Sequence, residues 1–239
     1  MTERLLTVRG LSAGYAGVPV VRDVDLHVDA GEVVGLLGPN GAGKTTTLLS
    51  ISGLVPALDG SIDVLGEPVE TKHPFRNARR SLAHVPENRS LFFDLTVREN
   101  LRLGGQGPKG DRNAAIEEAL ELMPALQPLQ DRRAGLLSGG EQQMLALARA
   151  LASRPRLVLI DEMSLGLAPI IVEQLLPIVR RVADEQGAGV LLVEQHVHMA
   201  LTVADRAVVL SHGQVVLDES AEALRADPSV LESSYLGGA

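Results

Sequence analysis

The sequence has 239 residues, of which 45% are hydrophobic, so it is long enough for one large domain with an extensive core. Aromatic residues make up only 2% and tryptophan is absent, so Val, Leu, Ile and Ala must fill that core, as in a parallel sheet covered by helices. The formal net charge of -8 argues against a broad phosphate-binding face, and we expect no nucleic-acid partner. The absence of cysteine excludes disulfides, thiolate catalysis and cysteine-ligated metals.

Two features of the sequence bear on membranes and secretion. No apolar run reaches the ~18 residues that a spanning helix needs. The N-terminus carries the charged residues Glu3 and Arg4 and has no apolar segment of the kind a signal peptide needs. We therefore expect a chain that is neither secreted nor embedded and that meets a membrane only through a partner.

The chain begins with a predicted antiparallel β-lobe, because residues 4–30 alternate apolar and polar positions over short runs separated by glycines. The continuous apolar run 33–37 then leads into a glycine-rich turn and a helical pattern at 44–52. More strands of an α/β core are predicted at 157–160, 190–193 and 207–210, the last turning at Gly213 into a hairpin with 215–217.

A helical region interrupts this α/β pattern between two prolines. Residues 112–123 and 139–152 each place apolar side chains on one helical face. We predict one domain over residues 1–239, with a core lobe formed by residues 1–85 and 156–239 and an inserted α-helical lobe at about 86–155.

The turn after the first buried strand matches a phosphate-binding loop. Residues 38–45 read GPNGAGKT and fit the pattern G-x-x-x-x-G-K-[ST] in full. Its glycines let backbone N–H groups point at phosphate oxygens, and the following helix adds its positive end. Lys44 is expected to reach the β- and γ-phosphates of ATP, and the Thr45 hydroxyl to ligate Mg²⁺. The predicted nucleotide contacts in this segment are Gly38, Pro39, Asn40, Gly41, Ala42, Gly43, Lys44, Thr45 and Thr46.

Two adjacent carboxylates, Asp161 and Glu162, end the apolar run 157–160. The tip of a parallel strand is where open α/β sheets bind their ligands. We expect Asp161 to hold Mg²⁺, directly or through water, and Glu162 to polarise the attacking water. Taken alone, the pair could equally cap the next helix.

A helix start follows at residues 137–143, which read LSGGEQQ. Ser138 and Glu141 form the S-x-x-E pattern of a capping box. Two glycines in a first turn weaken a helix, but they expose backbone N–H groups at its positive end, which suits a phosphate.

LSGGE followed by QQMLALARAL, a strand and Asp-Glu resembles the ATP-binding subunits of ABC transporters, and the resemblance extends over the whole chain. In that family two such domains pair head to tail. The resemblance implies that Ser138, Gly139 and Gly140 face the nucleotide held by the partner. It also implies that Tyr15 stacks on adenine, although a half-buried strand tyrosine would look the same.

Two positions depart from the commonest family pattern. Glu87 stands where most relatives carry a glutamine that contacts Mg²⁺, although an exposed loop acid is the alternative. Gln195 stands where most relatives carry a histidine at the γ-phosphate, and His196 follows one place later. Because neighbouring strand side chains face opposite ways, Gln195 is the preferred catalytic residue beside Lys44 and Glu162. A bare pair such as His196 and His198 is rarely a metal site.

These departures, together with SLGLAP at 164–169 and YLGG at 235–238, resemble the LivF-type branch of branched-chain amino acid importers. The resemblance implies pairing with a second ATP-binding subunit and two permease subunits, and an indirect partnership with an extracytoplasmic solute-binding protein. It also implies a cytoplasmic location, peripheral on the inner face of the cell membrane.

Two other functions share the phosphate-binding residues. An ABC ATPase that drives export or lipid extraction would differ only at its partner surface. A non-transport ABC ATPase of DNA repair or translation is disfavoured by the single P-loop, the lack of cysteine and the interval of under one hundred residues between the P-loop and LSGGE.

Overall fold

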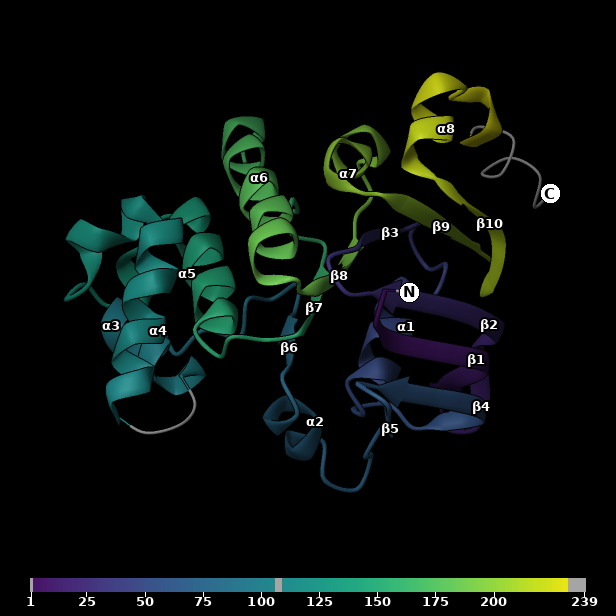
Figure 1. The fold of residues 1–239 in the computed structure, drawn as a ribbon, viewed down its shortest axis with the longest axis horizontal. Helices are drawn as coiled ribbons and strands as arrows, with labels where there is room; N and C mark the ends of the chain where they lie inside the picture. Colours follow the sequence, from purple (N-terminus) through teal and green to yellow (C-terminus); the bar gives the residue numbers. More distant parts are fainter. Residues whose placement is uncertain (1, 106–108, 232–239) are drawn as a thin grey trace.

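Two β-sheets lie against each other in the computed structural model, which describes residues 2–105 and 109–231 (Figure 1). The first sheet is antiparallel, with strand order β2-β1-β4-β5. The second has the order β10-β9-β3-β8-β7-β6 and is parallel except for β10, which forms an antiparallel hairpin with β9. The strands are β1 Arg4–Tyr15, β2 Val18–Asp29, β3 Val33–Leu37, β4 Ala57–Val64, β5 Glu67–Pro68, β6 Leu82–Val85, β7 Leu157–Asp161, β8 Gly189–Val193, β9 Arg206–Ser211 and β10 Gln214–Ser220.

The parallel sheet separates two apolar cores, because successive side chains of a strand point to opposite faces. On β7, Leu157 and Leu159 enter the core shared with α1 and the antiparallel sheet. Val158 and Ile160 enter the core shared with the helices of the other face. Strands buried on both faces read as continuous apolar runs, which is why the sequence identified them.

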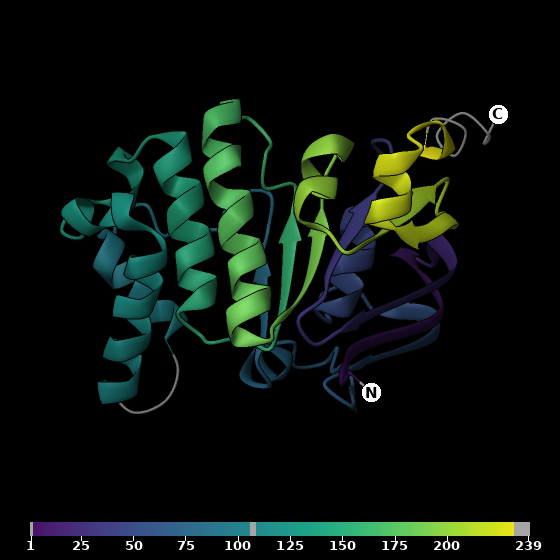
Figure 2. The ribbon, with the colours of Figure 1, turned by 45° about the horizontal axis from the view of Figure 1, so that its top comes forward.

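Helices cover the second core, and Figure 2 shows α5 and α6 standing beside the parallel strands with α1 on the far side. Among the described residues, no helix combines the length and the apolar character needed to cross a membrane. The helices are α1 Lys44–Ile51, α2 Phe75–Arg79, α3 Val97–Gly104, α4 Lys109–Leu122, α5 Gly139–Leu151, α6 Pro169–Gln186, α7 Val197–Val203 and α8 Ala221–Ala226, with short 3-10 turns at Pro124–Leu129 and Ala134–Leu136.

The predicted fold class is confirmed: an antiparallel N-terminal sheet, a parallel core sheet and helices between β6 and β7 are all present. The helices predicted at 112–123 and 139–152 occur as α4 and α5, each within three residues of the expected bounds at either end. The division into one domain with two lobes stays a prediction, since the side chains of α3, α4 and α5 share a core with the parallel sheet. The YLGG segment at 235–238 lies outside the described residues.

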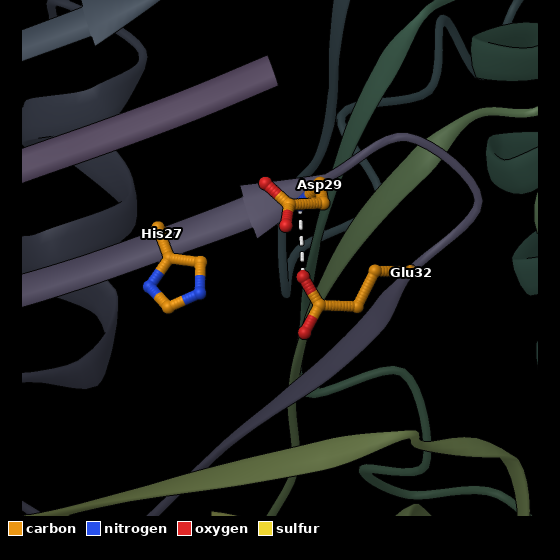
Figure 3. Close-up of side chains that lie close together, drawn as sticks. All are labelled: His27, Asp29 and Glu32. Carbon is orange, nitrogen blue, oxygen red and sulfur yellow. Dashed lines mark hydrogen bonds between the residues drawn. The ribbon is translucent and has the colours of Figure 1, made fainter. Parts of the chain in front are cut away.

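A cluster of ionisable groups joins the two sheets where β2 ends and β3 begins (Figure 3). The carboxylates of Asp29 and Glu32 accept hydrogen bonds from Arg4 and Arg206, respectively, both at 3.0 Å. Burial and then the charges of these two arginines lower the pKa of His27, while Glu32 and Asp29 act in the opposite direction. With both carboxylates already paired to guanidinium groups, the cluster serves as an ion-pair junction between the sheets.

Candidate functional site

The phosphate-binding loop connects β3 to α1, and its glycines are required by its shape. Gly38 has φ 148°, and a Cβ built there would lie 2.2 Å from the Leu210 carbonyl oxygen. Gly43 has φ 104°, and a Cβ there would lie 2.3 Å from Cγ1 of Val21. Side chains are excluded at both positions, so the loop can curl tightly around an anion.

The Lys44 side chain lies inside this loop and is only 4% exposed. Its Nζ donates to the carbonyl oxygens of Gly38 at 2.9 Å and Pro39 at 3.1 Å, and lies 3.8 Å from Glu162 Oε1. Burial lowers the pKa of Lys44, while Glu162 and other nearby carboxylates act in the opposite direction. A buried ammonium whose hydrogen bonds go to neutral carbonyl oxygens is well suited to take a charged phosphate oxygen in their place.

Asp161 lies at the tip of β7, where it accepts a hydrogen bond from Thr45 Oγ1 at 3.3 Å. Burial raises the pKa of Asp161 to about 6, the Thr45 bond opposes this, and the charges of Glu162 and Glu87 raise it further. Glu87 is therefore close enough to influence the site, although its own side chain is exposed. Three carboxylates that repel one another, beside the Thr45 hydroxyl, offer the oxygen ligands that suit a hard divalent cation such as Mg²⁺.

Glu162 adopts a left-handed backbone, with φ 46°, and its N–H donates to the Val193 carbonyl at 3.0 Å. Its Oε2 accepts a hydrogen bond from Gln195 Nε2 at 2.7 Å. His196 is exposed and begins α7 without a side-chain capping bond. The preference for Gln195 over His196 thus agrees with the geometry, because Gln195 is the residue that contacts Glu162.

Sequence reasoning missed Glu194, which is 1% exposed. Its carboxylate accepts hydrogen bonds from Ser164 N at 3.0 Å and Ser164 Oγ at 2.5 Å. Burial raises the pKa of Glu194, and the Ser164 bonds counter it. This contact joins the loop after Glu162 to the segment directly after β8, in which Gln195 is the next residue. A carboxylate directly after a buried strand was the available signal, as it was for Asp161.

Ser138 caps α5 with the predicted capping box: Glu141 N donates to Ser138 Oγ at 3.3 Å, and Ser138 N donates to Glu141 Oε2 at 2.7 Å. Ser138 and Gly139 are exposed. In both views α6 and the parallel strands stand between α5 and α1 (Figures 1 and 2). The LSGGE residues 137–141 at the start of α5, here called the signature segment, are therefore apart from the phosphate loop of their own chain.

Tyr15 ends β1 and is 52% exposed as a residue, so adenine stacking is sterically open and stays a prediction. Thr46 is buried in the first turn of α1, and Ala42 is buried in the loop before it. A cavity of about 140 Å³ runs along the loop, lined by Val20, Asn40, Gly41, Gly43, Lys44, Thr45, Thr46 and Glu162.

Residues 21–164 match the family model described as ABC transporter, and the chain belongs to this family. It is an ATP-binding and ATP-hydrolysing subunit of the ABC type.

Three known proteins illustrate the relationship. The chain is 44% identical over 235 residues to BraG of Pseudomonas aeruginosa, a high-affinity branched-chain amino acid transport ATP-binding protein, covering 98% of this chain and 100% of BraG. It is 37% identical to the lipopolysaccharide export system ATP-binding protein LptB of Escherichia coli, covering 97% of each. A solved structure of an ATP-binding subunit of an ABC transporter superposes with a TM-score of 0.84 at 30% identity, covering 98% of both chains. The resemblance to the branched-chain amino acid branch is confirmed by the first of these.

Proposed function

We propose that this chain energises import of branched-chain amino acids or related small solutes by hydrolysing Mg-ATP. The observation that carries the proposal is the set of contacts at the tips of β3, β7 and β8, where Lys44, Asp161, Glu162 and Gln195 converge. The likeness to BraG over the full length of both chains supports the choice of solute class.

Each side chain of the site has a separate task in this proposal. Lys44 exchanges the Gly38 and Pro39 carbonyls for phosphate oxygens. Thr45 and Asp161, with Glu87 nearby, hold Mg²⁺, which neutralises phosphate charge when bound. Glu162 accepts the proton of the attacking water, for which it must leave Lys44.

Gln195 orients the Glu162 carboxylate rather than titrating itself. Its amide donates one hydrogen bond at 2.7 Å and carries no charge at any working pH. The carboxylate is thereby held in one orientation, and its other oxygen becomes available to water once Lys44 turns to phosphate.

The signature residues Ser138, Gly139 and Gly140 serve a second ATP-binding subunit in a head-to-tail dimer. This assignment is supported by the exposure of Ser138 and Gly139 and by the separation of α5 from the phosphate loop of the same chain. Two permease subunits complete the transporter and receive solute from an extracytoplasmic binding protein. The chain is then peripheral on the cytoplasmic face of the membrane and touches it only through the permeases.

An export or lipid-extraction role is the second candidate, favoured by the 37% identity to LptB over 97% of each chain. Uptake of radiolabelled leucine, isoleucine and valine in cells deleted for this chain separates the two roles. Restored uptake with the wild-type chain, and none with Lys44→Ala, is the expected result. Uptake that is independent of the chain, with ATPase activity intact, would favour export.

A further inference from the structure

The segment that carries Glu87 is fastened to the helix that begins at the signature serine. It leaves β6 and reverses direction at Arg89 and Ser90, which have φ 63° and 45°. Left-handed backbone is unfavourable for two successive non-glycine residues, so it persists only where other contacts hold it. Arg149 of α5 supplies two of these contacts, donating to the Ser90 carbonyl at 2.8 Å and the Arg89 carbonyl at 3.2 Å.

The Arg89 guanidinium makes the return contacts. Its Nε donates to Gln143 Oε1 at 2.9 Å and its Nη1 to Gln142 Oε1 at 3.1 Å. The Gln142 amide in turn donates to the Leu137 carbonyl at 3.2 Å, directly before Ser138. The guanidinium nitrogens lie 3.8 and 3.9 Å from where a Cβ on Gly139 would stand. Arg89 therefore lies directly behind the first turn of α5.

Gln143 indicates that the hydrogen bonds between Arg89 and α5 do more than fill space in the core. Its side chain is 2% exposed, and its Nε2 has no hydrogen-bond partner among the described residues. A buried amide with an unsatisfied donor is unfavourable compared with an apolar side chain of similar size. Within the described part of the chain its oxygen accepts a hydrogen bond from Arg89, and this bond explains the presence of an amide here.

We infer that Arg89 is a positioning residue that links the Glu87 side of one nucleotide site to the signature turn serving the other. This rests on the proposed function, in which Glu87 acts toward the chain's own Mg-ATP and Ser138 toward the partner's. When the segment around Glu87 moves, the Arg89 guanidinium moves with it. Its hydrogen bonds to Gln142 and Gln143 then displace the start of α5. Lysine cannot replace the guanidinium, because a single ammonium lacks the planar set of donors that binds both amide oxygens at once.

The test uses the transporter co-purified with this subunit, carrying Arg89→Ala or Arg89→Lys. We expect Arg89→Ala to lower kcat for ATP hydrolysis roughly tenfold or more and to move the Hill coefficient for ATP toward 1, while ATP affinity of the isolated subunit changes less than about twofold. Arg89→Lys should fall between wild type and Arg89→Ala. The matched control is Arg9→Ala, an exposed arginine on β1, which should leave every value unchanged.

A double-mutant cycle with Gln142→Ala isolates the link, because residues acting through one contact give non-additive losses. Additive losses, unchanged kcat in Arg89→Ala, or a parallel loss of ATP affinity in the isolated subunit would each overturn the inference. If Arg89→Ala fails to fold, Arg89→Lys with Gln142→Ala supplies the same cycle. Lys44→Ala in the same complex tests the proposed function separately: normal hydrolysis there would refute that function itself.

Discussion

Replacing Gln195 by alanine removes the hydrogen bond that orients the Glu162 carboxylate. The bond is 2.7 Å long, its acceptor is charged, and the Gln195 side chain is partly buried. A hydrogen bond to a charged group contributes about 1.5–3 kcal/mol. If that energy is realised while Glu162 activates water, its loss slows hydrolysis by about 10- to 100-fold. His196→Ala changes an exposed side chain and should leave the rate within about twofold of wild type.

The assay is the steady-state release of phosphate by the assembled transporter with saturating Mg-ATP, at several pH values. Gln195→Glu is a useful companion, since a second carboxylate beside Glu162 would repel it and should be at least as slow as Gln195→Ala. A larger loss in His196→Ala than in Gln195→Ala, together with loss of a pH dependence near the histidine pKa, would refute this assignment.

Three further predictions test other parts of the molecule. Glu162→Gln should keep ATP binding, slow hydrolysis by about 10²–10⁴-fold and accumulate an ATP-bound dimer visible by gel filtration; normal turnover would move the base elsewhere. Ser138→Arg should leave ATP affinity of the isolated subunit nearly unchanged and block the assembled transporter; a large loss of affinity in the monomer would contradict a role across the dimer. Burial lowers the pKa of His84 to about 4, so the folded protein holds this ring in its neutral form. Protonation below pH 6.5, the ordinary histidine pKa, therefore favours the unfolded chain, and stability is lost as pH falls toward 4. The free energy of unfolding, measured with urea, should fall by about 3 kcal/mol over this range in the wild type but not in His84→Gln. The same pH dependence in both proteins would exclude His84 as the cause.

The parts of the fold that the sequence predicted are those determined by neighbouring residues. The buried strands 33–37 and 157–160 and the loop between β3 and α1 depend on local apolar runs and glycines. β4 escaped prediction because most of its side chains are exposed and its pairing with β1 is a contact between distant segments. α3 was also overlooked, although Thr96 and Glu99 form a readable capping box.

The same distinction applies to the site. Lys44, Asp161 and Glu162 were proposed from motif spacing alone. Gln195 was preferred because of strand alternation, but β8 ends at Val193, so that reason does not hold and the preference rests on the contact of Gln195 with Glu162. The contact between Glu194 and Ser164 joins residues 30 positions apart, and the bonds from Arg89 to α5 join residues more than 50 apart. Contacts of this kind depend on how the elements pack, which local patterns do not encode.

Hydrolysis of ATP by the purified transporter with wild-type or Lys44→Ala chain tests the central claim most directly. Lys44 is a buried cation held by two carbonyl oxygens and Glu162 inside the phosphate loop. Its removal should abolish productive ATP binding and reduce phosphate release to background, while the far-ultraviolet circular dichroism spectrum stays that of the wild type. Unchanged ATP affinity and turnover in a folded Lys44→Ala protein would contradict the account.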